Sequence, residues 1–405
     1  MPAASEMPRA RTRDPRLDFF RGLGMIIIMI AHIPWSSWTE WLPSRFGFSD
    51  GADMFVFCSG MASAIAFGSI FTEAGWWLGL ARIVHRAWQV YWAHIGSFFV
   101  VAAMMVAADS WFGGDHYVRE ELFLANFLAA PQQFLPRLMT LTYVPSYFDI
   151  LPMYIVILCM VPVVMALARL HLALVPAFCA GLWLAANFGG LELTADVTDG
   201  RTWFFNPFAW QLVFFTGFAL ARGWLPAPPR DGPMMLAAIV VVLAAMPVSC
   251  HQGYGCFAGF GYFPVLGQIH DWLGPAIGKH NLGVLRYAHF MATAYIAFVL
   301  AGEGGRNLTG RLAGIIRRLG QQTLAVFLCS LAVAQAMGIL MDAAGGQVHD
   351  LAGRSFLVTA FANLSGIALL VAGAFVVSWF KASPWRRARK VAANGAAPVA
   401  SPPTF

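Results

Sequence analysis

Runs of about twenty apolar residues, separated by short polar segments, most limit what this 405-residue chain can fold into. Apolar residues make up 59% of the chain and charged residues 11%, whereas soluble domains average about 45–50% and about 25%. The runs do not alternate between polar and apolar residues as strands of a membrane barrel do. The sequence therefore predicts an all-α polytopic membrane protein and excludes a soluble enzyme.

Ten such runs are candidate transmembrane helices, which places both termini on the same side of the membrane. They cover about 17–35, 51–71, 84–108, 148–168, 171–190, 203–221, 233–249, 285–302, 320–341 and 355–380. With cytoplasmic termini, 18 of the 26 Lys and Arg residues fall inside, seven fall outside, and Arg21 lies within the first span. This asymmetry follows the positive-inside rule. It accounts for the net charge of +6 without a nucleic-acid partner.

The domain organisation that follows is a transmembrane domain over 1–380 and a tail over 381–405 that is first basic and then disordered. Two outer loops are long, at about 109–147 and 250–284. In the first, Val118 to Ala130 forms an amphipathic stretch that predicts one interfacial helix ended by Pro131. The second is rich in aromatic residues, which suit either a sugar or the membrane interface. It also holds Cys250 and Cys256, either as a disulfide or as two free thiols.

The first span carries three polar side chains along one side of the expected helix. Asp14 and Pro15 are typical of a helix start. Arg21 and His32 are eleven residues apart, so they share a face at a separation of about 16.5 Å, and Asp18 lies one turn below Arg21. Charged residues inside a span are costly and are therefore functional candidates. The alternatives are that Arg21 extends to the inner interface and that His32 only packs.

The second span begins near the level of His32, and its first turn contains Asp53. A carboxylate beside an imidazole fixes the tautomer and stabilises the imidazolium. Asp53 is therefore a candidate partner of His32, with a helix cap as the alternative. Ser49 and Asp50 are capping candidates, and Ser59-Gly60 predicts close helix packing.

Further polar residues gather at the two faces of the membrane. Arg82 and Arg86 are one turn apart at the inner face and can present two guanidinium groups to one polyanion, or simply orient the protein. A second group of polar residues within the spans predicts a polar cavity that opens outwards. One of them, His94, lies mid-span, where it either lines a substrate channel or forms hydrogen bonds between helices. These candidates are His94, Asp149, Tyr154, Asn206, Gln211, Arg286 and His289. No Cys/His spacing typical of a metal site is present.

The motifs resemble those of a known family of membrane acyltransferases. LDFFRGLGMIIIMIAH and GADMFVFCSGM resemble the first two spans of the acyltransferase-3 superfamily. RDPRLDFFRG, FGFSDGADMFVF, RAWQVYWAHI, FDILPMYIVIL, FNPFAWQLVFFTG and LRYAHF together resemble the OpgC family. Two departures are Ala31, where an acidic residue is expected, and Asp53, where Glu is more usual.

The resemblance implies a succinyltransferase of the bacterial inner membrane that modifies osmoregulated periplasmic glucans. Succinyl-CoA would be a co-substrate and not a resident cofactor, bound from the cytoplasm at Arg82, Arg86 and Asp18. His32, oriented by Asp53 and aligned with Arg21, would deprotonate a glucan hydroxyl for direct attack on the thioester, with a covalent acyl-His intermediate as the alternative. Acetyl transfer to another envelope polysaccharide is one alternative. A transporter or flippase for an anionic substrate is another, although it predicts inverted repeats that the sequence lacks.

Overall fold

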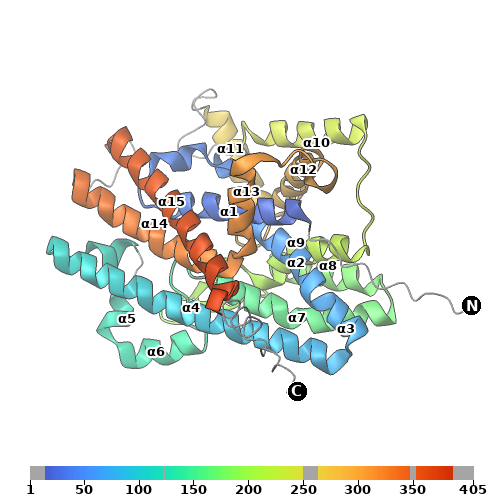
Figure 1. Ribbon diagram of the computed structural model, residues 1–405, viewed down its shortest axis with the longest axis horizontal. Coiled ribbons are helices and arrows are strands. Elements are labelled where there is room, and N and C mark those ends of the chain that lie inside the picture. Colours follow the sequence, from blue (N-terminus) through green and yellow to red (C-terminus); the bar gives the residue numbers. More distant parts are fainter. Residues whose placement is uncertain (1–13, 122–123, 250–262, 347–352, 386–405) are drawn as a thin grey trace, which may run out of the picture.

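The computed structural model describes residues 14–121, 124–249, 263–346 and 353–385, and in these it is a bundle of helices with one small hairpin (Figure 1). The α-helices are α1 (Pro15–Ala31), α2 (Gly51–Ser63), α3 (Ser69–Glu73), α4 (Trp76–Phe112), α5 (Ala125–Ala129), α6 (Pro131–Met139), α7 (Ile150–Leu170), α8 (Leu174–Phe188), α9 (Pro207–Arg222), α10 (Gly232–Ala245), α11 (Pro264–Ile277), α12 (Val284–Ala301), α13 (Gly310–Gln321), α14 (Thr323–Gly345) and α15 (Phe356–Lys381). Short helical turns are η1 (Ser37–Trp41), η2 (Pro43–Arg45), η3 (Ala64–Gly68), η4 (Tyr117–Glu121) and η5 (Glu303–Gly305). The hairpin pairs β1 (Thr194–Asp196) with β2 (Arg201–Thr202).

All ten predicted spans contain a helix, and six helices in the described chain are long and apolar enough to cross a membrane. These are the continuous helix Gly51–Glu73 together with α4, α7, α12, α14 and α15. The remaining four, α1, α8, α9 and α10, have 17, 15, 16 and 14 residues. At 1.5 Å per residue they reach about 21–26 Å, less than a hydrocarbon core of about 30 Å. Ten crossings and cytoplasmic termini therefore stay predictions.

The predicted loops needed correction. The single interfacial helix from Val118 to Ala130 is wrong: the described residues there form η4 and α5, and Pro131 begins α6 instead of ending a helix. Proline is favoured in the first turn, where no backbone N–H is needed. The helices α11 and α13 and the β1–β2 hairpin lie in segments interpreted as loops. Cys250 and Cys256 lie outside the described residues.

Helix α1 lies in the centre of the bundle, packed on α2, α13 and α14 (Figure 1). Asp14 caps its start by accepting the Arg16 N–H at 2.9 Å, and Pro15 occupies the first turn, as predicted. The helix ends at Ala31, earlier than the predicted span, with His32 as its C-cap. The imidazole of His32 is therefore held at a helix end, next to the connection to η1.

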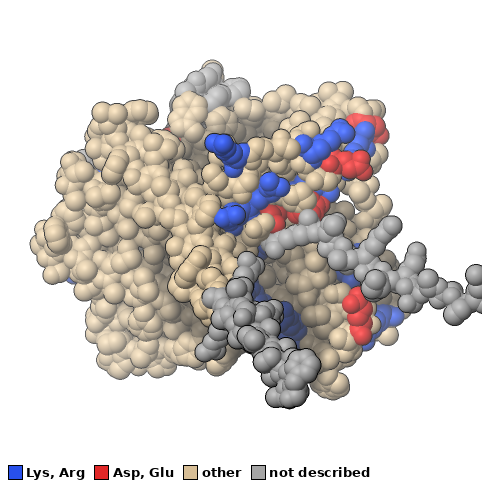
Figure 2. All heavy atoms as spheres, viewed as in Figure 1, with Lys and Arg blue, Asp and Glu red and all other residues tan. Residues whose placement is uncertain are grey.

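Several basic residues lie at one end of the bundle and contact aromatic rings or backbone carbonyls there. The guanidinium carbons of Arg16 and Arg230 lie 4.4 and 5.0 Å from the centre of the Phe298 ring. Arg169 donates to the Phe71 carbonyl at 2.5 Å. Figure 2 shows charged side chains over the part of this face that carries α12 and α13, and hardly any over α14 and the far end of α4. The charged side chains seen on this face are thus concentrated on one part of it. The assignment of that end to the cytoplasm stays a prediction.

Two pairs of helices cross at glycines that bring their backbones together. Gly60 of α2 faces the Phe214 carbonyl of α9, which confirms the close packing predicted from Ser59-Gly60. Gly22 of α1 likewise faces the Ile316 carbonyl of α13. A Cβ at either glycine would collide with backbone that cannot rotate away. These crossings fix the position of α1 relative to α13 and of α2 relative to α9, and hence of the polar residues at the C-terminal end of α1 and the N-terminal end of α2.

We expect Gly60→Ala to destabilise the protein by about 1–3 kcal/mol, because the added methyl forces α2 and α9 apart. The matched control is Gly181→Ala in α8, where no other atom lies within 4 Å and the change favours the helix. Thermal unfolding in detergent measures both variants. Equal melting temperatures for the two would contradict the close crossing.

Candidate functional site

The imidazole of His32 has a fixed orientation at the C-terminal end of α1. Its Nδ1 lies 2.6 Å from the Ile28 carbonyl oxygen, so Nδ1 carries the proton and donates it. Its ring packs edge-on against Tyr147 at 5.2 Å. The other nitrogen, Nε2, has no hydrogen-bond partner among the described residues, and the side chain is half-buried. In the neutral imidazole with its proton on Nδ1, Nε2 is therefore the nitrogen that can accept a proton from a ligand.

The prediction that Asp53 orients His32 is wrong, because both Asp53 oxygens are already engaged. Asp53 Oδ1 and Oδ2 accept from Arg286 at 3.2 and 2.6 Å, and Oδ2 also accepts the Asp50 N–H at 2.9 Å. Asp53 is fully buried and Arg286 is 5% exposed. A buried carboxylate forms its strongest bonds with a guanidinium, which can reach both of its oxygens. The backbone carbonyl of Ile28 takes the orienting role at His32.

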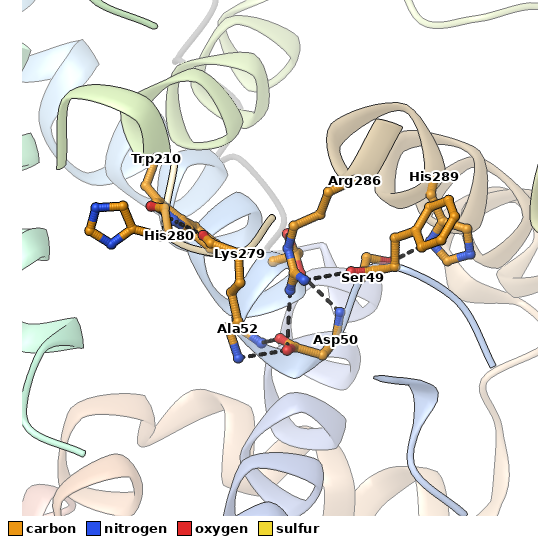
Figure 3. A network of polar contacts seen from close by, with 10 residues as sticks. Ser49, Asp50, Ala52, Trp210, Lys279, His280, Arg286 and His289 are labelled. Atoms are coloured by element: carbon orange, nitrogen blue, oxygen red, sulfur yellow. Dashed lines mark hydrogen bonds and ion pairs between the residues drawn. The ribbon is translucent and has the colours of Figure 1, made fainter. Parts of the chain in front are cut away.

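Asp50 joins this ion pair to a second cation from the segment before α12 (Figure 3). Its Oδ2 lies 2.6 Å from Lys279 Nζ and 3.1 Å from Arg286 Nη2, while its Oδ1 caps α2 by accepting the Ala52 N–H. Burial alone would raise the pKa of the Asp50 carboxyl, but Lys279 and Arg286 outweigh burial and hold the pKa well below its usual range. The site thus brings two carboxyl groups and two basic side chains together.

Ser49 and His289 form a buried pair on the other side of Arg286 (Figure 3). Ser49 Oγ lies 2.8 Å from His289 Nδ1, and each residue is 4% exposed. Arg286 Nη1 donates to the Phe48 carbonyl, so its guanidinium is attached to the turn that carries Ser49. The sequence placed Arg286 and His289 in an outer pocket but did not connect them to Asp53 or Ser49.

A small cavity joins Arg21, Arg86 and Tyr154, together with Ser59 of α2. Its free volume is about 20 Å³, roughly the space of one water molecule. The sequence placed Arg21 with the catalytic residues and Arg86 at the donor site, whereas in the structure both line one cavity. Tyr154 belongs to this cavity and not to the outer pocket. Its hydroxyl lies 3.4 Å from Ser63 Oγ.

Two other residues predicted at the inner site lie away from this cavity. Arg82 is exposed on α4. Asp18 is buried where α1 crosses α13, and its carboxylate accepts from Gln321 Nε2 at 3.4 Å. The position of Asp18 follows from the Gly22 and Gly320 contacts between these helices.

A larger apolar groove runs along α1, α2 and α12 with a free volume of about 150 Å³. One end is lined by Asp14, Arg16 and Phe298, and the other end by Ser49 and Asp50. Along α1 it extends from Leu17 to Ile27, about 15 Å. The groove therefore connects the charged end of the bundle with the buried ionic network.

The remaining candidates for an outer pocket do not converge. Asp149 accepts the Phe204 N–H at 3.0 Å and holds the segment before α9, and Asn206 caps α9 and donates to Leu191 and Asn281. Gln211 donates to the Cys179 carbonyl at 2.7 Å and joins α9 to α8. These three are structural links. His94 is fully buried beside Phe148, and neither ring nitrogen has a partner in the described chain.

The sequence missed Lys279 and the ionic role of Asp50. Asp50 was interpreted only as a cap, and Lys279 lies 229 residues away in a loop interpreted as aromatic. Two acidic residues in one helical turn, Asp50 and Asp53, were the available signal, since two buried carboxylates need cations. No group of three His, Cys, Asp or Glu in the described residues is placed to hold a metal ion.

These features define a helical membrane protein with a buried, charged site at the end of a groove that follows its apolar helices. The chain belongs to the OpgC family: the family model described as OpgC protein matches residues 13–382. This confirms the predicted resemblance to that family. It is a bacterial family, and membership implies an acyltransferase-type enzyme with a role in modifying osmoregulated periplasmic glucans. No curated protein and no solved structure matches the chain.

Proposed function

We propose that this protein is an inner-membrane O-acyltransferase that transfers a succinyl group from cytoplasmic succinyl-CoA to a hydroxyl of a periplasmic glucan. The observation that carries the proposal is the fixed tautomer of His32. With Nδ1 bonded to Ile28, Nε2 is the proton acceptor that activation of a sugar hydroxyl requires. The placement within the acyltransferase-3 superfamily belongs to the same proposal.

The groove along α1 supports transfer across the membrane. Its charged end is lined by Arg16 and Phe298, and Arg230 also lies over the Phe298 ring. Two guanidinium groups there suit the phosphates of CoA. Its apolar walls suit the pantetheine arm, and its far end reaches Ser49 and Asp50. The anionic part of the donor thus stays at the inner face while the thioester reaches the depth of the ionic network.

Acyl transfer by the purified protein in lipid nanodiscs tests the function directly. We expect the protein to esterify glucan in the presence of succinyl-CoA, with products identified by mass spectrometry. Acetyl-CoA in a parallel reaction decides between succinyl and acetyl transfer. Glucan that stays unmodified with both donors, but accumulates inside sealed proteoliposomes, would favour a transporter.

We expect Arg16→Gln and Arg230→Gln each to raise KM for acyl-CoA about tenfold with little change in kcat, because each removes a charge-assisted contact made equally in the ground and transition states. The comparison variant is Arg82→Gln/Arg86→Gln, since the sequence alone favours that pair. Steady-state kinetics at several salt concentrations measures both. A KM increase confined to the Arg82/Arg86 variant would assign the donor to the small cavity and contradict the groove.

A further inference from the structure

The Ser49–His289 pair has the geometry of a nucleophile and its base. The hydroxyl oxygen and the ring nitrogen are 2.8 Å apart, within the range of activated serine nucleophiles. Both side chains are buried, and Ser49 lines the apolar groove.

The depth of Ser49 in the bundle matches that of His32. Gly51 packs against Ile27 and Ile28 of α1, and Ile28 is the residue whose carbonyl holds His32. Because α1 and α2 run in opposite directions, Ser49 and His32 continue from this contact to the same level. Helix axes in contact are about 8–10 Å apart, so the two side chains lie on neighbouring helices at one level.

From these observations we propose that Ser49 is acylated during turnover, so that the reaction proceeds through a serine ester. The inference rests on the proposed function. Ser49 Oγ attacks the thioester carbonyl and its proton passes to His289 Nδ1. The C–S bond breaks, and the CoA thiolate takes the proton from His289 and leaves as the free thiol.

The second half of the reaction uses His32. Its Nε2 removes the proton of a glucan hydroxyl, and the glucan oxygen attacks the ester carbonyl. The bond from that carbon to Ser49 Oγ breaks as the new ester forms. Ser49 regains, through water, the proton that the glucan gave to His32, so no further reactant is consumed. Arg286, attached to the Ser49 turn, supplies positive charge where negative charge develops.

The first experiment maps the adduct. Wild-type protein and His32→Ala are incubated with succinyl-CoA, with and without glucan, digested, and analysed by tandem mass spectrometry. We expect one succinyl ester on Ser49, with higher occupancy in His32→Ala when glucan is present, because deacylation then lacks its base. A succinyl group on His32, or no adduct in either protein, would overturn the proposal.

The second experiment tests the residue by substitution. We expect Ser49→Ala to lose about 100-fold or more in glucan acylation, Ser49→Cys to keep activity through a thioester cleaved by neutral hydroxylamine, and His289→Gln to acylate Ser49 slowly. Ser69→Ala is the control, since the Ser69 hydroxyl bonds only to its own helix. Ser49→Ala at half of wild-type activity or more would overturn the proposal.

Kinetics of the wild-type protein add a measurement that needs no variant. A serine ester predicts parallel double-reciprocal plots for the two substrates, whereas direct transfer predicts intersecting ones. Intersecting plots together with glucan acylation would refute the ester and leave the acyltransferase function intact. Absence of glucan acylation by the wild-type protein would instead refute the function itself.

Discussion

His32→Ala should reduce glucan acylation about 10²- to 10⁴-fold while the protein reaches the membrane in normal amount. The substitution removes the nitrogen that accepts the proton of the sugar hydroxyl. His32 sits at a helix end and is half-buried, so its loss leaves the glycine crossings of α1 intact. Quantification of succinylated glucan by mass spectrometry, with the protein level measured in the same membranes, gives the result.

The appropriate control for this prediction is His85→Ala. His85 is an exposed histidine of α4 that bonds to Gln89 at 3.0 Å on its own helix. We expect its activity to equal that of the wild type. Near-normal glucan modification by a well-expressed His32→Ala protein would remove His32 from the mechanism.

Asp53→Asn should destabilise the protein by about 3 kcal/mol and reduce acyl transfer at least about tenfold. An amide in place of the carboxylate leaves the buried Arg286 with Asp50 as its only carboxylate partner. Arg286 donates to the Phe48 carbonyl, and Asp53 accepts the Asp50 N–H, so the substitution weakens two contacts that hold the turn carrying Ser49. Thermal unfolding and initial rates measure the two effects separately.

The double variant Asp53→Asn/Arg286→Gln distinguishes an ion pair from a helix cap. Removing both charges eliminates the uncompensated guanidinium. We therefore expect the double variant to lose less unfolding free energy than the two single variants lose together. Strictly additive losses would mean that the two residues act independently. Wild-type rates in Asp53→Asn would reduce Asp53 to a cap of α2.

The sequence by itself determined the membrane class, the position of ten helical segments and the family. Long apolar runs predict helices because the bilayer requires a minimum length and an apolar composition of every spanning helix. Local signals were equally reliable: Asp14-Pro15 begins α1, Asp50 caps α2, and Ser59-Gly60 marks a close crossing. Each depends on residues within a few positions of one another.

Only the tertiary structure decided which polar residues meet. Asp53 and His32 were paired because their depths match, but depth does not say which side of a helix faces which neighbour. Arg286, 233 residues further along the chain, donates to both Asp53 oxygens. The His32 ring is instead bonded to the Ile28 carbonyl, one helical turn earlier. Buried charged groups form ion pairs with whichever opposite charges the packed helices bring within bonding distance, however far away these are in the sequence. For that reason Ser49, Lys279 and the groove along α1 could be recognised only after α2 and α12 were placed beside it.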